Sequence, residues 1–174
     1  MHPLNRPKKQ SKAQARLGQV LAGWFLLVLI FAVRTGLAAE TAGPVKVQRN
    51  DKCPVCGMFV AKYPKWVAEI VFKDGSYAVF DGCKDMFKYL FDMGRYNREK
   101  TREDIARIYV TEYYSTRILP AREVLYVLGS DVLGPMGHEF IPVQGEENAR
   151  IFLSDHKGKR VLRFDEITPE DIPR

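Results

Sequence analysis

The sequence predicts an α+β protein made of two small β-β-α-β units packed together, after an N-terminal signal peptide or signal anchor. Three observations predict it. A basic segment and an apolar run open the chain, two later stretches repeat one order of elements, and each stretch alone would bury too little apolar surface for comfortable stability. With 46% hydrophobic and 28% charged residues, the composition is that of a chain that folds around a core.

Residues 1–38 have the three-part pattern of a secretory signal peptide. Residues 1–19 are polar and basic, residues 20–33 form an uninterrupted apolar run, and Gly36 and Ala38 provide small side chains at a cleavage spacing. The apolar run is shorter than the roughly 20 residues of a transmembrane helix. We therefore expect cleavage after Ala38 and an exported, periplasmic body, which an uncleaved anchor would tether to the membrane. No cysteine precedes Cys53, so the leader lacks the residue that a lipid anchor needs.

The net charge of +6 belongs to the leader. Before Ala38 there is no acidic residue, and the basic residues there are Arg6, Lys8, Lys9, Lys12, Arg16 and Arg34. The rest of the chain carries basic and acidic residues in equal number. We expect no nucleic-acid binding, because no basic stripe is left to neutralise phosphates.

The first unit, residues 51–118, follows a polar lead-in at 39–50. Residues 65–73 and 77–80 are rich in β-branched and aromatic side chains and flank an Asp-Gly-Ser turn, which predicts a hairpin. Apolar side chains at 83, 86, 87 and 90 have helical spacing and predict a helix from residue 81 or 82 to about residue 94. A charged connection at 97–103 leads to a predicted strand at 104–114.

The second unit, residues 119–174, repeats that order. We expect a strand at 121–128, a glycine-rich link, a second strand at 139–143 and a helix at 145–156. The Lys-Gly-Lys segment at 157–159 ends this helix, and residues 160–164 form the last strand.

Three cysteines and several methionines carry the chemistry. Residues 53–58 (CPVCGM) gather two thiols and a thioether, a set that suits a soft metal such as Cu(I), while paired thiolates also suit Zn²⁺. A third thiol lies in residues 80–87 (FDGCKDMF), and residues 134–138 (GPMGH) add a thioether and an imidazole. Three cysteines cannot all pair within one exported chain, so metal or redox chemistry explains them better than a disulfide framework.

Most candidate ligands also have a structural alternative. Met58 and Met86 can be ordinary core residues, although Met58 lies beside two thiols. Cys83, at a predicted helix start, is placed either for a lowered thiol pKa or for burial. Met136 and His138 alternate along a predicted extended segment, so both can point into one site.

The combination of CPVCGM, FDGCKDMF and the later Gly-Pro-Met-Gly resembles the NosL family, copper-binding accessory proteins of nitrous oxide reductase maturation. The resemblance covers about residues 50 to 168. It implies a periplasmic protein of two β-β-α-β units that binds Cu(I) and hands copper to nitrous oxide reductase, beside a membrane transporter complex encoded with it. Many members are lipoproteins, and this chain departs from them by having no lipid-box cysteine.

The resulting hypothesis is a shallow, low-coordinate Cu(I) site from which a partner's ligands can take the metal. Its candidate ligands are Cys53, Cys56, Met58, Cys83, Met86, Met136 and His138. A structural zinc site of the three cysteines and His138 is one alternative, and a thiol oxidoreductase that uses Cys53 and Cys56 is another. The sequence has no Ser-His-Asp set, paired-carboxylate pattern or phosphate loop, so we expect no enzyme. It leaves open the copper client and a homodimer that supplies ligands from both chains.

Overall fold

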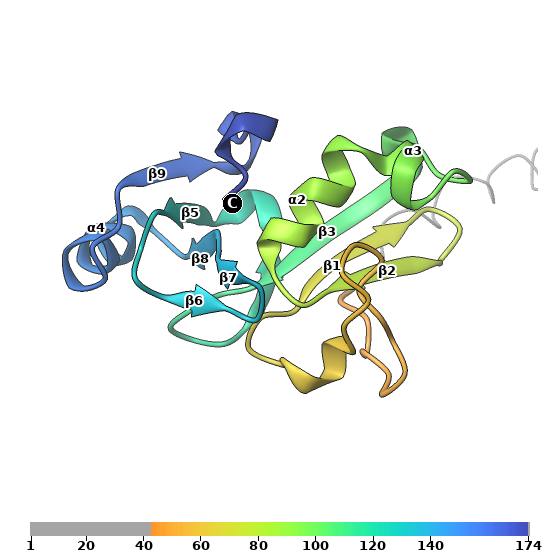
Figure 1. The fold of residues 1–174 in the computed structure, drawn as a ribbon, viewed down its shortest axis with the longest axis horizontal. Helices are drawn as coiled ribbons and strands as arrows, with labels where there is room; N and C mark the ends of the chain where they lie inside the picture. Colours follow the sequence, from red (N-terminus) through yellow and green to blue (C-terminus); the bar gives the residue numbers. More distant parts are fainter. Residues whose placement is uncertain (1–42, 174) are drawn as a thin grey trace, which may run out of the picture. The chain divides into compact units, whose positions relative to one another are not determined.

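Two antiparallel sheets form the framework of residues 43–173, the part of the chain that the computed structural model describes (Figure 1). The predicted leader lies outside these residues. The first sheet contains, in order across it, β2 (Tyr77–Phe80), β1 (Ala68–Phe72), β3 (Ile105–Thr111) and β4 (Ile118–Pro120). The second sheet contains β8 (Ile141–Val143), β5 (Leu125–Leu128) and β9 (Arg160–Arg163).

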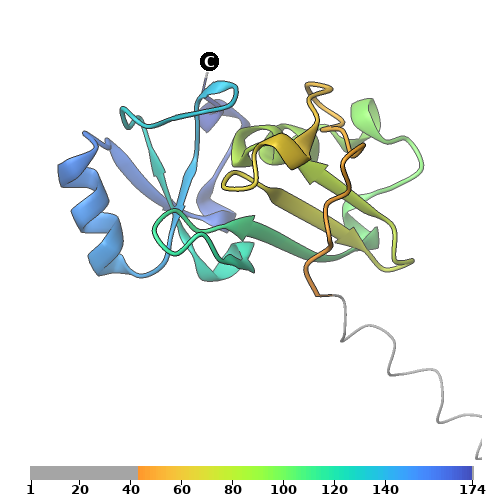
Figure 2. The same cartoon turned by 90° about the horizontal axis from the view of Figure 1, so that it is seen from below.

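Three helices and a small hairpin complete these elements. The helices are α2 (Cys83–Phe91), the short α3 (Met93–Tyr96) and α4 (Glu146–Asp155). The hairpin, β6 (Leu133–Gly134) with β7 (Gly137–His138), lies between β5 and β8 in the sequence. Each sheet has its own helix, and α4 lies on the side of the second sheet away from α2 (Figure 2).

The predicted α+β class is confirmed, with the element orders β1-β2-α2-β3 and β5-β8-α4-β9. The turn between β1 and β2 lies at the predicted Asp-Gly-Ser, where Gly75 has a φ of +85° that favours glycine. The sequence did not predict β4, which spans the predicted boundary between the units, or the β6–β7 hairpin. Strands of two or three residues are too short to show the alternation on which strand prediction depends.

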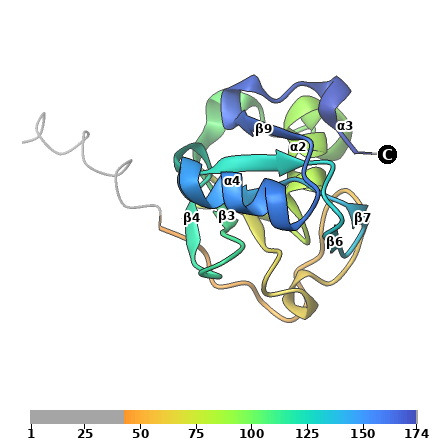
Figure 3. The ribbon, with the colours of Figure 1, turned by 90° about the vertical axis from the view of Figure 1, so that its left-hand side faces the viewer.

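Each helix covers its sheet with the face that its apolar spacing predicted. Met86, Phe87 and Leu90 of α2 are buried in a core that includes Ile70 and Phe80 of the first sheet. In the second half Ala149 and Phe152 of α4 pack with a separate, smaller cluster from β5 and β8. Figure 3 views the molecule from the side on which α4 lies. That cluster comprises Val127, Ile141 and Val143.

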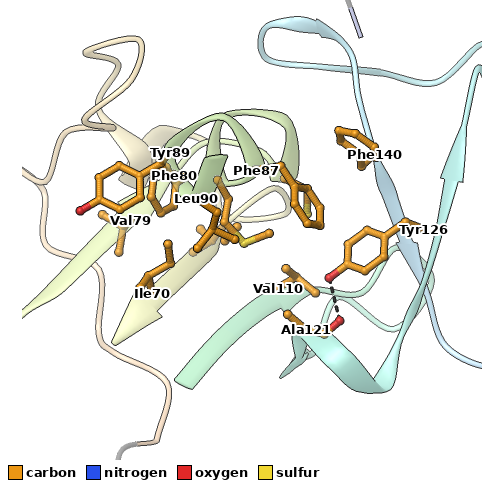
Figure 4. Packing of buried hydrophobic residues seen from close by; sticks show 14 of the residues in the cluster. Ile70, Val79, Phe80, Phe87, Tyr89, Leu90, Val110, Ala121, Tyr126 and Phe140 are labelled. Carbon is orange, nitrogen blue, oxygen red and sulfur yellow. Dashed lines mark hydrogen bonds between the residues drawn. The ribbon is translucent and has the colours of Figure 1, made fainter. Parts of the chain in front are cut away.

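The ring of Phe87 joins α2 to the second half of the chain (Figure 4). Its centroid lies 5.3 Å from that of Tyr126, 5.0 Å from that of Phe140 and 5.2 Å from that of Phe164. Tyr126 is also fully buried, and its hydroxyl donates to the carbonyl of Ala121 at 2.8 Å. Edge-to-face and tilted aromatic pairs of this kind add to the free energy gained from burial alone.

We expect Phe87→Ala to lower the free energy of unfolding by about 3–5 kcal/mol, because it removes a buried ring on which three rings from the second half of the chain pack. Phe59→Ala is the matched control, since the ring of Phe59 is 38% exposed. The control should cost less than about 1 kcal/mol. Urea denaturation followed by circular dichroism measures both, and equal losses for the two variants would contradict this account of the core.

Candidate metal centre

Residues 52–59 form a tight hairpin that carries both cysteines of the CPVCGM segment. Lys52 and Phe59 form an antiparallel bridge at its base, and the amide of Cys53 donates to the carbonyl of Met58 at 2.9 Å. The amide of Gly57 donates back to the carbonyl of Cys53, also at 2.9 Å. Gly57 has a φ of +79°, which a residue with a side chain adopts only with strain. This turn folds the two thiols toward each other.

The two thiols lie against two carboxylates from the junction of β2 and α2. The sulfurs of Cys53 and Cys56 and one oxygen each of Asp81 and Asp85 all lie within 4.8 Å of one another. Cys56 Sγ donates to Asp81 Oδ1 at 3.1 Å, and Cys53 Sγ donates to Asp85 Oδ2 at 3.5 Å. We call these four residues the thiol–carboxylate cluster.

Burial keeps the thiols of the cluster protonated and leaves one of its four residues partly exposed. Cys53, Asp81 and Asp85 are buried, whereas Cys56 is half-buried. Burial raises the pKa of the Cys53 thiol well above its usual range, and burial together with the hydrogen bond to Asp81 raises the pKa of Cys56 to about 11. Asp81 Oδ2 is buried without a hydrogen-bond partner among the described residues. A bound cation would compensate this unpaired oxygen.

The two candidate methionine ligands that lie nearest the cysteines in the sequence, Met58 and Met86, differ in burial. Met58 is half-buried on the hairpin, and its amide donates to the sulfur of Cys56. Met86 has no exposed surface and is part of the hydrophobic core under α2.

Cys83 lies apart from the thiol–carboxylate cluster, although it is the first residue of α2 as predicted. Of the two alternatives given for Cys83, a lowered thiol pKa or burial, the structure shows burial. Burial raises the pKa of Cys83 well above its usual value, and the negative charge of Glu139 raises it further. The cost of placing a thiolate away from water outweighs the favourable helix dipole.

His138 also lies outside the cluster. The predicted extended segment is present only in part, since His138 is on β7 but Met136 occupies the turn between β6 and β7, and both residues are exposed. Within residues 43–173 the ligand atoms of the three cysteines and His138 are therefore not gathered into one group, as the predicted zinc tetrahedron requires.

Comparison with known proteins places these residues in a family. The sequence profile of NosL matches residues 44–172. The chain belongs to the NosL family. The copper-binding lipoprotein NosL of Stutzerimonas stutzeri is 29% identical over 169 residues, which cover 87% of this chain and 82% of that protein. The crystal structure of the copper chaperone NosL from Shewanella denitrificans has the same fold, with a TM-score of 0.63 and 23% identity over 74% of this chain and 97% of the other.

The signal peptide or anchor predicted for this NosL-family chain falls on residues that the structure does not describe. Among the helices of residues 43–173, none has the length and apolar character needed to span a membrane.

Three acidic residues of the site were missed by sequence reasoning. Asp81 and Asp85 flank Cys83 at a spacing of one helical turn, a signal that the sequence contains. Glu139 had no such signal, because the amide of Lys84 that it accepts from lies 55 residues away. Its buried carboxylate accepts from the amides of Lys84 and Phe140, and a Cβ at Gly82 would lie 2.1 Å from Glu139 Oε2. Glycine at 82 therefore makes room for this carboxylate on the first turn of α2.

Burial raises the pKa of Glu139 to about 8, which predicts a pH-dependent stability. A carboxyl group whose pKa is raised on folding stabilises the fold fully only below its unfolded pKa, and this contribution is lost as pH rises toward 8. We expect the stability of the wild-type protein, measured relative to Glu139→Gln, to fall by up to about 4 kcal/mol between pH 5 and pH 8. Urea denaturation of both proteins across this range provides the measurement. A constant difference between them would contradict the prediction.

Proposed function

We propose that this NosL-family chain is an exported metallochaperone that binds Cu(I) at the thiol–carboxylate cluster. In this proposal it carries copper in the periplasm to nitrous oxide reductase, beside a membrane transporter complex of the same maturation system. The observation that carries the proposal is the position of Cys53 and Cys56, whose sulfurs meet on one hairpin at the edge of solvent. The printed names of the two relatives, which describe copper binding and a copper chaperone, support it.

The donor set explains why Cu(I) would be bound and also released. Two thiolates, with the thioether of Met58 on the same hairpin, are the soft ligands that Cu(I) prefers. Binding would displace the thiol protons to solvent, with Asp81 and Asp85 as the first hydrogen-bonded acceptors. With both protons in solvent, two thiolates and two carboxylates would lie around a single positive charge, that of Cu(I). This accumulation of negative charge favours return of a proton to sulfur, and with it transfer of the metal to a partner.

Substitutions of the cysteines should show that Cu(I) binding depends on Cys53 and Cys56 and not on Cys83. Loss of a residue that only supports a metal ligand typically weakens affinity by roughly 10–100-fold. We therefore expect Cys56→Ser or Cys53→Ser to weaken Cu(I) binding by more than about 100-fold, and Met58→Leu to weaken it less. Cys83→Ala, the matched control, should leave it within about threefold. Anaerobic titration of the reduced protein against a coloured Cu(I) chelator measures these affinities. Equal losses for Cys83→Ala and Cys56→Ser would contradict the assignment.

The raised thiol pKa values predict how the affinity depends on pH. Because the Cys56 thiol stays protonated up to a pKa of about 11, Cu(I) must displace a proton throughout the neutral range. The apparent affinity should rise with pH, by about tenfold per pH unit for each thiol proton displaced. Chelator competition between about pH 6 and pH 8 tests this, with the pH dependence of the chelator measured separately. An affinity independent of pH would mean that the thiols are not the ligands.

Zinc is the second candidate, because a set of two thiols and two carboxylates also suits a tetrahedral Zn²⁺ site. In that case the metal would hold the fold, and its removal should unfold the protein. The printed names of both relatives, which describe copper, favour Cu(I) over Zn²⁺. Competition between Zn²⁺ and Cu(I), followed by circular dichroism after chelation, distinguishes the two. Zinc retained against Cu(I), with unfolding on its removal, would overturn the copper proposal.

The thiol oxidoreductase alternative fits the geometry less well. Such enzymes need a thiolate of lowered pKa near neutral pH, usually at a helix N-terminus or beside a cation. Here both hairpin thiols have raised pKa values and face carboxylates.

A further inference from the structure

The neutral body of the protein hides an uneven distribution of charge. The segment from residue 43 to 66, which contains the cysteine hairpin, has one acidic residue, Asp51, while the rest of the body is slightly acidic. Its basic residues are Lys46, Arg49, Lys52, Lys62 and Lys65. All five are exposed, and none forms an ion pair with any residue in the part of the chain that the structure describes.

Two of these lysines flank an exposed ring at the base of the hairpin. The ammonium of Lys52 lies 4.9 Å from the ring centroid of Phe59, and that of Lys62 lies 5.5 Å from it. The ring is 38% exposed. We call these three residues the basic hairpin face. Nearby, the carboxylate of Asp51 accepts from the amide of Gln48 and from the hydroxyl of Tyr77 rather than pairing with a lysine.

The exposed part of the thiol–carboxylate cluster belongs to the same hairpin as this face. Of the four cluster residues only Cys56 is partly exposed, and it lies between Lys52 and Phe59 in the hairpin sequence. Both carboxylates are buried. A molecule that takes copper from Cys56 therefore has to approach this hairpin, whose base is formed by Lys52 and Phe59.

We propose that the basic hairpin face is the docking surface for the protein that exchanges copper with this chain, and that this partner presents a negatively charged surface around its own copper ligands. The inference rests on the proposed function. Opposite charges raise the rate of encounter by roughly 10–10³-fold and orient the partner. The exposed ring of Phe59 supplies an apolar anchor at the centre of such a contact.

A protein fits this face better than a lipid surface. Ligand exchange needs a soft donor atom brought to Cys56, which an anionic lipid headgroup does not supply. Membrane-binding elements also present a broad apolar surface, whereas the ring of Phe59 stands between two ammonium groups.

The first test measures copper transfer to two small chelators that share the same metal-binding group but differ in charge. Anaerobic stopped-flow spectroscopy follows Cu(I) leaving the loaded full-length protein for bathocuproine disulfonate, which is anionic, or for neocuproine, which is uncharged. The double variant Lys52→Glu with Lys62→Glu should lower the ratio of anionic to uncharged transfer rates by about tenfold at low salt. The effect should vanish near 1 M salt, where the Debye length is about 3 Å.

Control variants distinguish the local electrostatic effect of Lys52 and Lys62 from an effect of net charge or of misfolding. Lys157→Glu with Lys159→Glu makes the same charge change just after α4, on the far side of the second sheet, and should leave the ratio unchanged (Figure 1). Lys52→Gln with Lys62→Gln should give an intermediate ratio, and circular dichroism checks the fold of each variant. An unchanged ratio in the folded, copper-loaded Lys52→Glu, Lys62→Glu protein overturns this inference alone. A wild-type protein that takes up no Cu(I) overturns the proposed function as well.

The second test uses a macromolecular probe and locates the contact. Poly-L-glutamate added to the isotope-labelled protein should shift amide resonances of residues 46–65, and Phe59→Ala with Lys52→Gln should reduce these shifts. Shifts centred elsewhere would overturn the inference. Cosedimentation with phosphatidylglycerol vesicles that is lost in the same variant would overturn it in favour of a membrane-binding surface.

Discussion

The start of α2 is the constraint on which the rest of the structure depends. Asp81, Asp85 and Lys84 are all buried there, and buried polar groups are tolerated only when they are paired. The cysteine hairpin supplies thiols to the two carboxylates from one direction, while Glu139 caps the amide of Lys84 from the second half of the chain. The ammonium of Lys84 in turn donates to the carbonyl of Met136. One helical turn therefore connects the hairpin, the first sheet and the β6–β7 hairpin.

The same arrangement supports the proposed metal site. The thiols donate to carboxylates, so the buried oxygens are partly satisfied and the hairpin is held in place. Loading exchanges those hydrogen bonds for metal–sulfur bonds, with loss of the thiol protons. Burial raises the thiol pKa values, so a returning proton competes with the metal for each sulfur. In the proposed function this competition favours release of the metal.

The sequence predicted those parts of the fold and site that depend on local patterns. Helix α2 was evident from the spacing of its apolar residues, the β1–β2 hairpin from its turn, and the paired thiols from their CxxC spacing. Asp81 and Asp85 were missed because their thiol partners lie 25 and 32 residues away, and only the folded chain brings them together. The sequence left the pKa of Cys83 open between two alternatives, because the burial that raises it depends on tertiary packing. The turn at Met136 was missed because strands of two residues leave no periodic pattern, whereas His138 does lie on a strand.

The central claim is that the hairpin thiols, and not Cys83, bind the metal. X-ray absorption at the copper edge of the Cu(I)-loaded protein tests it most directly, because it counts the sulfur atoms bound to copper. The account predicts sulfur-dominated coordination that is unchanged in Cys83→Ala and loses sulfur in Cys56→Ser. Coordination dominated by nitrogen or oxygen, or a loss of sulfur in Cys83→Ala, would contradict it.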